Sequence, residues 1–255
     1  MKHLIITISA ALFLATCGTE PKSQEGCEEG CKKENCEHEK GEKSCAAECK
    51  KDCCSNEETK LKIGDTNPAL ENKLMDVSGE EIYIEELGKK NGTLLIFSCN
   101  TCPFVVGNGE KSQGWENRYN DIQAMATKLE IGFALINSNE AKRSGEDSFD
   151  NMILHAKERG YNGIKYLVDS KHAVADAYSA ITTPHVYLFN ANNELVYTGA
   201  IDDNVDSKEE VKEHWLADAM KELAEGKEIT KPITKNMGCS IKRVKKEDAH
   251  HGHDH

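Results

Sequence analysis

Two cysteines separated by two residues, Cys99 and Cys102, have the spacing in this chain that most directly indicates chemistry. They lie in the stretch FSCNTCPF, at the end of the apolar run GTLLIFSC and directly before Pro103. Such a pair can cycle between a dithiol and a disulfide, and its reactive form is the thiolate. The pattern predicts a redox pair, with half of a metal site or a structural bridge as the alternatives.

The elements on either side of the pair determine its reactivity. GTLLIFSC is a continuous apolar run, which predicts a strand buried on both faces, and we expect a helix from Pro103 to about Leu129. The first turn of a helix favours negative charge, because its backbone N–H groups are unpaired. We therefore expect Cys99 to be the attacking thiolate and Cys102 to be the resolving cysteine, one turn into the helix.

The region from residue 61 to about 235 has the composition of a globular domain and alternates strands with helices. Two short strands around a Ser78-Gly79 turn come first, and a hairpin turning at Asn192-Asn193 comes late. Between them we expect buried strands in GTLLIFSC, IGFALINSN and IKYLVD, and a helix in SFDNMILHAKERG capped by Ser148. The order predicts an α/β, thioredoxin-like fold: a central mixed sheet flanked by helices, with an N-terminal β-hairpin.

Several motifs together resemble one known family. FSCNTCPFV, ALINSN, EDSFDNM, TTPHVYLF, LVYTGAIDDN and GCSIK resemble the thioredoxin-like redoxins of the alkyl hydroperoxide reductase/thiol-specific antioxidant superfamily, in the bacterial branch with CxxCPF and GCSIK signatures. The resemblance covers about residues 61 to 243. It implies thiol-based redox activity at Cys99 and Cys102 without an organic cofactor. It also implies protein disulfide or dithiol substrates and an electron donor in the cell envelope as partners.

Pro184, in ITTPHVYLF, is the second expected part of the site. In the thioredoxin fold a cis-proline at this point packs against the Cys-x-x-Cys pair. The resemblance therefore implies that Thr183 and Pro184 form the platform for an extended substrate. The alternative is an ordinary proline at a strand edge.

The chain also departs from the family pattern. Where peroxiredoxins have a proline and a threonine before the peroxidatic cysteine, this chain has Gly92 and Ile96. We therefore favour a disulfide oxidoreductase over a thiol peroxidase, which stays the second alternative. Thr182 replaces a cysteine that is common in the branch, and Thr93 stands where thioredoxins carry a buried acid.

The N-terminus predicts export. MKHLIITISAALFLATC has one lysine and an apolar run that is shorter than the ~20 residues of a membrane span, as in a signal peptide. LFLATC resembles a lipobox, although Thr16 is not the usual small residue. We expect residues 1–16 to be a signal peptide and Cys17 to carry the lipid of a membrane-anchored lipoprotein that faces the periplasm or the cell exterior. The alternative is an ordinary secretory signal.

Residues 17–60 form a tether rich in Cys, Glu and Lys, with too few aliphatic residues for a core. Its cysteines could be linked by disulfides in a spacer, or could bind a soft metal such as copper or zinc. These cysteines are Cys27, Cys31, Cys36, Cys45, Cys49, Cys53 and Cys54.

The last segment, residues 236–255, contains GCSIK and a histidine-rich tail. Cys239 could dock near the active site as a third redox thiol or be a structural cysteine. For His185, beside Pro184, we favour a structural place on the strand. The tail could bind zinc, copper or nickel, or be a solvated polar end, and its histidines are His250, His251, His253 and His255.

The net charge of −12 argues against a nucleic-acid partner. The sequence predicts an envelope-anchored thiol–disulfide oxidoreductase. A copper- or zinc-binding or delivery protein is the alternative from a different class.

Overall fold

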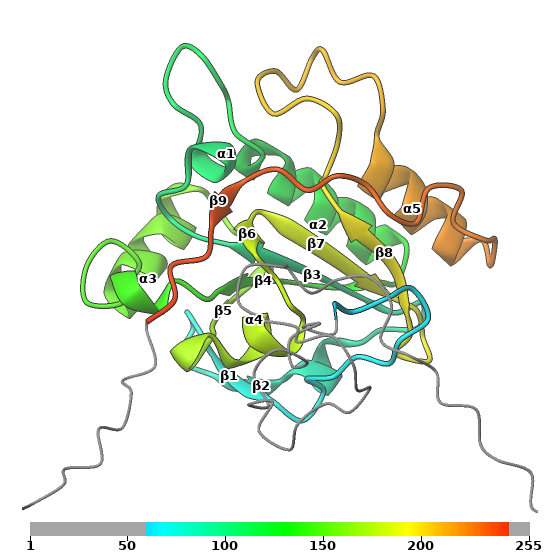
Figure 1. Ribbon diagram of the computed structural model, residues 1–255, viewed down its shortest axis with the longest axis horizontal. Helices are drawn as coiled ribbons and strands as arrows, with labels where there is room; N and C mark the ends of the chain where they lie inside the picture. Colours follow the sequence, from blue (N-terminus) through cyan, green and yellow to red (C-terminus); the bar gives the residue numbers. More distant parts are fainter. Residues whose placement is uncertain (1–59, 245–255) are drawn as a thin grey trace, which may run out of the picture. The chain divides into compact units, whose positions relative to one another are not determined.

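The computed structural model describes residues 60–244 (Figure 1). The predicted signal peptide, the lipidation site Cys17, the seven cysteines of the tether and the four tail histidines lie outside the described residues. Within residues 60–244, no helix combines the length and the apolar character needed to cross a membrane.

A seven-stranded mixed sheet with the strand order β2-β1-β5-β4-β3-β7-β8 forms the centre of the described part. The central strand β3 is parallel to β4 and antiparallel to β7, and β4 is parallel to β5. The strands of this sheet are β1 (Lys73–Asp76), β2 (Glu81–Tyr83), β3 (Thr93–Ser98), β4 (Gly132–Asn137), β5 (Lys165–Val168), β7 (His185–Phe189) and β8 (Leu195–Gly199). A second, two-stranded sheet pairs β6 (Thr182–Thr183) with β9 (Cys239–Ser240).

Helices cover both faces of the large sheet (Figure 1). The α-helices are α1 (Pro103–Val106), α2 (Tyr119–Lys128), α3 (Phe149–Glu158), α4 (Ala173–Ala177) and α5 (Trp215–Ala224). The 3-10 helices are η1 (Ile84–Leu87), η2 (Glu116–Arg118), η3 (Glu140–Lys142) and η4 (Ser170–His172). Side chains of α2, α3 and α5 pack in one core, and those of η1 and α4 pack in the other.

The two cores explain the continuous apolar run of β3. Leu94 and Ile96 pack in the core with α2, while Leu95 and Phe97 pack in the core with α4. Successive side chains of a strand point to opposite faces, so a strand covered on both sides must be apolar throughout. The predicted fold class is confirmed, including the antiparallel β1–β2 hairpin.

The predicted long helix after Pro103 is wrong. Helix α1 ends at Val106, and α2 begins only at Tyr119. Gly107 and Gly114 have φ values of 82° and 70°, which favour glycine, and a Cβ on Gly114 would lie 2.3 Å from the carbonyl oxygen of Val105. The chain therefore leaves the helix and folds back tightly on α1.

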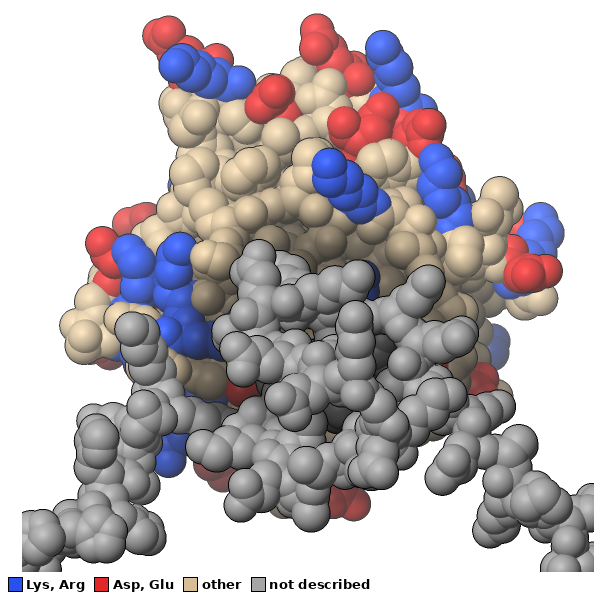
Figure 2. Space-filling model, viewed as in Figure 1, with Lys and Arg blue, Asp and Glu red and all other residues tan. Residues whose placement is uncertain are grey.

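Most charged side chains of residues 60–244 lie on the surface. On the face shown in Figure 2, basic and acidic groups are interspersed. Several form exposed ion pairs, such as Lys73–Glu81 at 2.6 Å and Lys90–Glu130 at 3.0 Å. Exposed pairs of this kind contribute little stability, about 0–1 kcal/mol each.

Candidate active site

The predicted redox cysteines lie where β3 meets α1. Cys99 follows the last residue of β3, and Cys102 is the N-cap of α1. Cys99 and Cys102 are 2% and 4% exposed, and both thiols contact the same residue, Thr183. The structure thus brings the two sulfurs together in a buried environment, and both are free thiols.

The expected position of Cys99 at the helix N-terminus is wrong. Because α1 begins at Pro103, the capping position belongs to Cys102, whose carbonyl accepts the N–H groups of Val105 and Val106. The helix has four residues, so its dipole is small. Any stabilisation of a thiolate by this helix N-terminus therefore acts on Cys102 rather than on Cys99.

The pKa values of the two thiols move in opposite directions. The hydrogen bond from the Cys99 thiol, together with donors from Cys239 and Thr183, lowers the pKa of Cys102 to about 5, against the opposing effect of burial. The Thr183 carbonyl oxygen, 3.0 Å from Cys102 Sγ, also opposes the thiolate because it can only accept. The hydrogen bonds donated to the sulfur outweigh burial and this acceptor, so the pKa of Cys102 is lowered.

The pKa of Cys99 is raised well above its usual value. The hydrogen bond to Cys102 is the largest cause, followed by burial and by the charge of Asp147. In this form of the protein the pair therefore holds its negative charge on Cys102. The predicted order of roles, with Cys99 as the ready thiolate, is not what these directions favour.

Thr183 and Pro184 lie against the thiols. The Thr183–Pro184 peptide bond is cis, as expected from the sequence. Thr183 Oγ1 lies 3.3 Å from Cys99 Sγ, and the Thr183 carbonyl oxygen lies 3.0 Å from Cys102 Sγ. One residue thus contacts both sulfurs.

The backbone edge beside the thiols is already paired. Strand β9 runs antiparallel to β6, with Cys239 opposite Thr183 and Ser240 opposite Thr182, and Figure 1 shows β9 beside β6. A Cβ on Gly238 would lie 2.3 Å from the Thr183 carbonyl oxygen, so only glycine allows this close approach. The edge expected to receive an extended substrate is occupied here by the chain's own C-terminal segment.

Asp147 is a site residue that the sequence analysis missed. Its side chain is fully buried and accepts the backbone N–H of Asn100 at 2.9 Å. It also accepts the side-chain amides of Asn137 at 2.9 Å and Asn139 at 3.0 Å. This carboxylate fixes the Cys-x-x-Cys loop and places a negative charge near Cys99. It lies in the EDSFDNM segment, whose spacing alone gives no such signal.

Asn100, between the two cysteines, connects the loop to the surrounding elements. Its side-chain amide donates to the Glu146 carbonyl oxygen at 2.9 Å, and its Oδ1 accepts from the Tyr166 hydroxyl at 2.8 Å. Burial raises the pKa of Tyr166 well above its usual value, so this hydroxyl stays protonated and donates. The backbone between the thiols is therefore held from two sides.

Neither the family models nor the curated proteins that were searched match this chain. Solved structures do match. An uncharacterized conserved protein from Geobacillus kaustophilus is 30% identical, with a TM-score of 0.63 over 72% of this chain and 93% of that one. A hypothetical protein from Sinorhizobium meliloti is 27% identical, with a TM-score of 0.63 over 72% of this chain and 96% of that one. The chain belongs to the same family as the G. kaustophilus protein.

The order of elements decides the fold. A Cys-x-x-Cys pair follows a central strand, parallel strands β4 and β5 come next, and a cis-proline precedes the antiparallel β7–β8 hairpin. The protein has a thioredoxin-like fold. More distant matches include a putative protein disulfide isomerase from Bacteroides thetaiotaomicron, at 13% identity and a TM-score of 0.47 over 65% of this chain and 91% of that one.

His185 of this thioredoxin-fold protein has the structural place that the sequence favoured. It is buried on β7, with its ring nitrogens 3.3 Å from the Tyr187 hydroxyl and 3.4 Å from the Thr198 hydroxyl. Burial, with a smaller effect of Lys60, lowers the pKa of His185 to about 3. The imidazole is therefore neutral at physiological pH.

Residues 60–244 hold no group of three or more His, Cys, Asp or Glu side chains arranged to bind a metal ion. The copper or zinc ligands expected from the sequence, in the tether and the tail, lie outside it.

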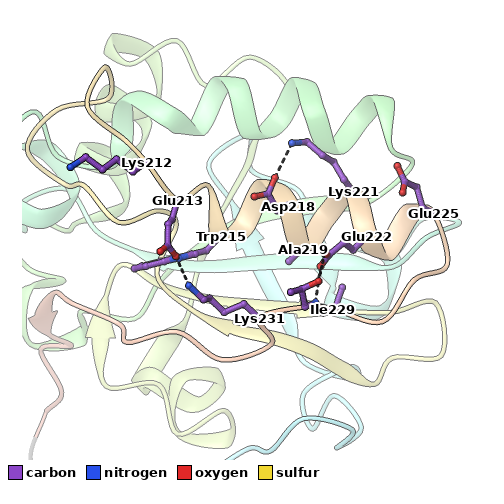
Figure 3. Close-up of a pocket in the computed structure, with 11 residues that line it drawn as sticks. Lys212, Glu213, Trp215, Asp218, Ala219, Lys221, Glu222, Glu225, Ile229 and Lys231 are labelled. Atoms are coloured by element: carbon purple, nitrogen blue, oxygen red, sulfur yellow. Dashed lines mark hydrogen bonds and ion pairs between the residues drawn. The ribbon is translucent and has the colours of Figure 1, made fainter.

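One surface hollow of the thioredoxin-fold domain is lined by residues of α5 and the segment after it, none of them a predicted site residue. Figure 3 shows this hollow of about 460 Å³ between α5 and the segment around Ile229 and Lys231. Its charged side chains pair with one another, as Lys231 does with Glu213 and Lys221 with Asp218. None of the predicted site residues lines it, so the candidate site is a buried thiol cluster rather than this hollow.

Proposed function

We propose that this protein is a thiol–disulfide oxidoreductase whose redox pair is Cys99 and Cys102. One observation carries the proposal: the two buried thiols both contact Thr183, the residue before the cis-proline. In the reducing direction a partner disulfide gains two electrons, and the pair becomes a disulfide. The chemistry is carried by the two sulfurs and needs no organic cofactor.

The perturbed pKa values support a redox role over a structural one. A structural cysteine buried among apolar groups is protonated and inert, because burial alone raises its pKa. Here several donors converge on Cys102 and lower its pKa to about 5, despite burial. A thiolate that persists at neutral pH is the form that attacks disulfides.

The test is reduction of insulin disulfides by the full chain with a dithiol as electron donor. Cys99→Ser and Cys102→Ser should each lower the rate by about 100-fold or more, because exchange needs both sulfurs. Thr101→Ala is the matched control. Thr101 is exposed between the two cysteines, and alanine leaves both thiols and the backbone in place. Wild-type turnover by either serine variant, or no turnover by the wild type, would contradict the proposal.

We further propose that the chain acts outside the cytosol, anchored by a lipid on Cys17. The apolar N-terminal run and LFLATC support this location, where disulfides persist. Its partners there would be protein disulfides or dithiols and an envelope electron donor. Replacing Cys17 with serine should move the protein from the membrane fraction to the soluble fraction. A wild-type protein that is already soluble would contradict the anchor.

A further inference from the structure

A third sulfur lies beside the redox pair. The Cys239 backbone N–H donates to Cys102 Sγ at 3.4 Å, and the Cys239 side chain packs against the core cluster that contains Cys99 and Cys102. Cys239 is only half-buried, whereas Cys99 and Cys102 are almost completely enclosed. Of the three clustered thiols, Cys239 is the one that solvent reaches.

The position of Cys239 is fixed from both sides along the chain. Before it, the Asn236 side chain donates to Thr182 Oγ1 at 2.8 Å, and Gly238 lies against the Thr183 carbonyl. After it, the Ile241 N–H donates to the Ile181 carbonyl oxygen at 3.0 Å, and the Ile241 side chain is buried in the core with α4. The segment is thus docked in one register, with its cysteine directed at Cys102.

Docking of β9 restricts how a partner protein can reach the pair. The Thr183 edge is paired with Cys239, and both sulfurs of the pair are buried. A partner disulfide therefore meets Cys239 first. We propose that Cys239 is a redox thiol that relays the disulfide between partner proteins and the buried Cys99–Cys102 pair. This inference rests on the proposed function and identifies Cys239 as the residue that first reacts with the partner disulfide.

The relay is a series of three balanced exchanges in the reducing direction. In the first, Cys239 attacks one sulfur of the partner disulfide. The other partner sulfur leaves and receives the Cys239 proton by way of Cys102. The result is a mixed disulfide on Cys239 and one partner thiol.

In the second exchange, the Cys102 thiolate attacks Cys239 Sγ, and the remaining partner sulfur leaves as a thiolate. In the third, Cys99 attacks Cys102 Sγ and releases Cys239, which takes up the Cys99 proton. The partner has gained two electrons, the buried pair is a disulfide, and Cys239 is again a thiol.

The acidities of the thiols favour the second exchange, whereas the first exchange requires Cys239 to lose its proton as it attacks. Burial and the neighbouring Cys102 raise the pKa of Cys239 to about 11, whereas the pKa of Cys102 is about 5. Cys239 therefore rests as a thiol and donates its proton to Cys102. Cys102 is the thiolate that is ready for the second exchange.

The decisive experiment stops the relay after the second exchange. In the full-length Cys99→Ser variant the third exchange is impossible, so insulin should convert the protein to a form with a Cys102–Cys239 disulfide. Acid quenching, alkylation and non-reducing peptide mapping would identify a linked pair of peptides, one containing Cys102 and the other Cys239. The Cys99→Ser/Cys239→Ser variant is the control that should lack it. Absence of the linked peptides from Cys99→Ser would overturn the relay.

Two further variants distinguish a relay role of Cys239 from a β9 strand that only covers the Cys99–Cys102 pair. Cys239→Ser should slow insulin reduction by about tenfold or more, because the entry thiol is lost. Gly238→Ala keeps all three thiols but places a methyl group 2.3 Å from the Thr183 carbonyl oxygen, so it should displace β9 and slow the reaction as well. A strand that merely covers the pair would give unchanged or faster reduction in both variants, which would overturn the relay.

The failure of the relay and the failure of the proposed function are distinguishable. Turnover by the wild type and Cys239→Ser at equal rates would remove the relay and keep the Cys99–Cys102 pair as the redox site. No turnover by the wild type would remove both.

Discussion

Two buried carboxylates, Asp147 and Asp202, are held in opposite ways. Asp202 pairs with the buried Arg118 guanidinium at 3.0 Å and accepts the Trp115 indole N–H at 2.6 Å. The Asp147 carboxylate accepts only neutral amide donors within residues 60–244, whereas the Arg143 guanidinium donates to the Asp147 backbone carbonyl oxygen at 2.7 Å. The first carboxylate has a cationic partner, whereas the second has only neutral donors.

The difference separates a structural group from a group that belongs to the site. Arg118 also donates to the carbonyl oxygens of Gly114 and Asn204, at 2.7 Å and 2.5 Å, so the ion pair fastens the loop after α1 to the loop after β8. The charge of Asp147 instead acts on a thiol, because it contributes to the raised pKa of Cys99. Amides can satisfy the hydrogen bonds of a carboxylate without cancelling its field.

The largest expected effect is on stability, in the variant Asp202→Asn. It leaves the Arg118 guanidinium buried without its counter-charge, which costs about 3–5 kcal/mol. Asp147→Asn loses no ion pair, and the cost of one badly oriented amide is about 1–3 kcal/mol. Denaturant unfolding at pH 7 measures both. Equal losses in the two variants would show that the two carboxylates do not differ as described.

The next effect is the acid sensitivity contributed by His185, a buried group whose pKa is lowered by burial. Its pKa is about 3 in the folded protein and 6.5 ordinarily, so the unfolded state binds more protons between these values. Stability is therefore lost as the pH falls from 6.5 towards 3, by about 3 kcal/mol once pH 4 is reached.

The check is denaturant unfolding at several pH values across this range. His185→Gln should show a shallower decline than the wild type, because glutamine takes up no proton. An equally steep decline in the variant would assign the acid sensitivity to other groups.

A smaller effect concerns the acidity of Cys99. In a Cys102→Ser background, Asp147→Asn should lower the pKa of Cys99, because a nearby negative charge is removed while burial remains. Thiolate absorbance as a function of pH measures the midpoint. Asp202→Asn in the same background is the matched control and should leave the midpoint in place. A midpoint unmoved by Asp147→Asn would contradict the role assigned to its charge.

The smallest effect is on Cys102. The thiolate absorbance of the wild type minus that of Cys102→Ser should titrate with a midpoint near pH 5, the pKa of Cys102. Cys239→Ser should raise this midpoint slightly, because it replaces one of several donors. A midpoint near 9, the ordinary value for a thiol, would show that the converging donors do not stabilise the thiolate.

The sequence alone determined the local elements that carry the site. The apolar run of β3, the short spacing of Cys99 and Cys102 and the proline before β7 were all readable, because each depends on a few neighbouring residues and on strand or helix geometry. The helix boundary was misjudged, since a break at glycines with positive φ depends on how the chain returns to α1.

Only the tertiary structure decided which groups surround the sulfurs. Asn100 and Asp147 are 47 residues apart, and Cys102 and Cys239 are 137 residues apart. No local pattern links such positions, because they meet only when the sheet is assembled and β9 docks on β6. The physical reason is that local geometry specifies strands and turns, whereas the pKa of a buried thiol depends on every donor and charge that packing brings to it.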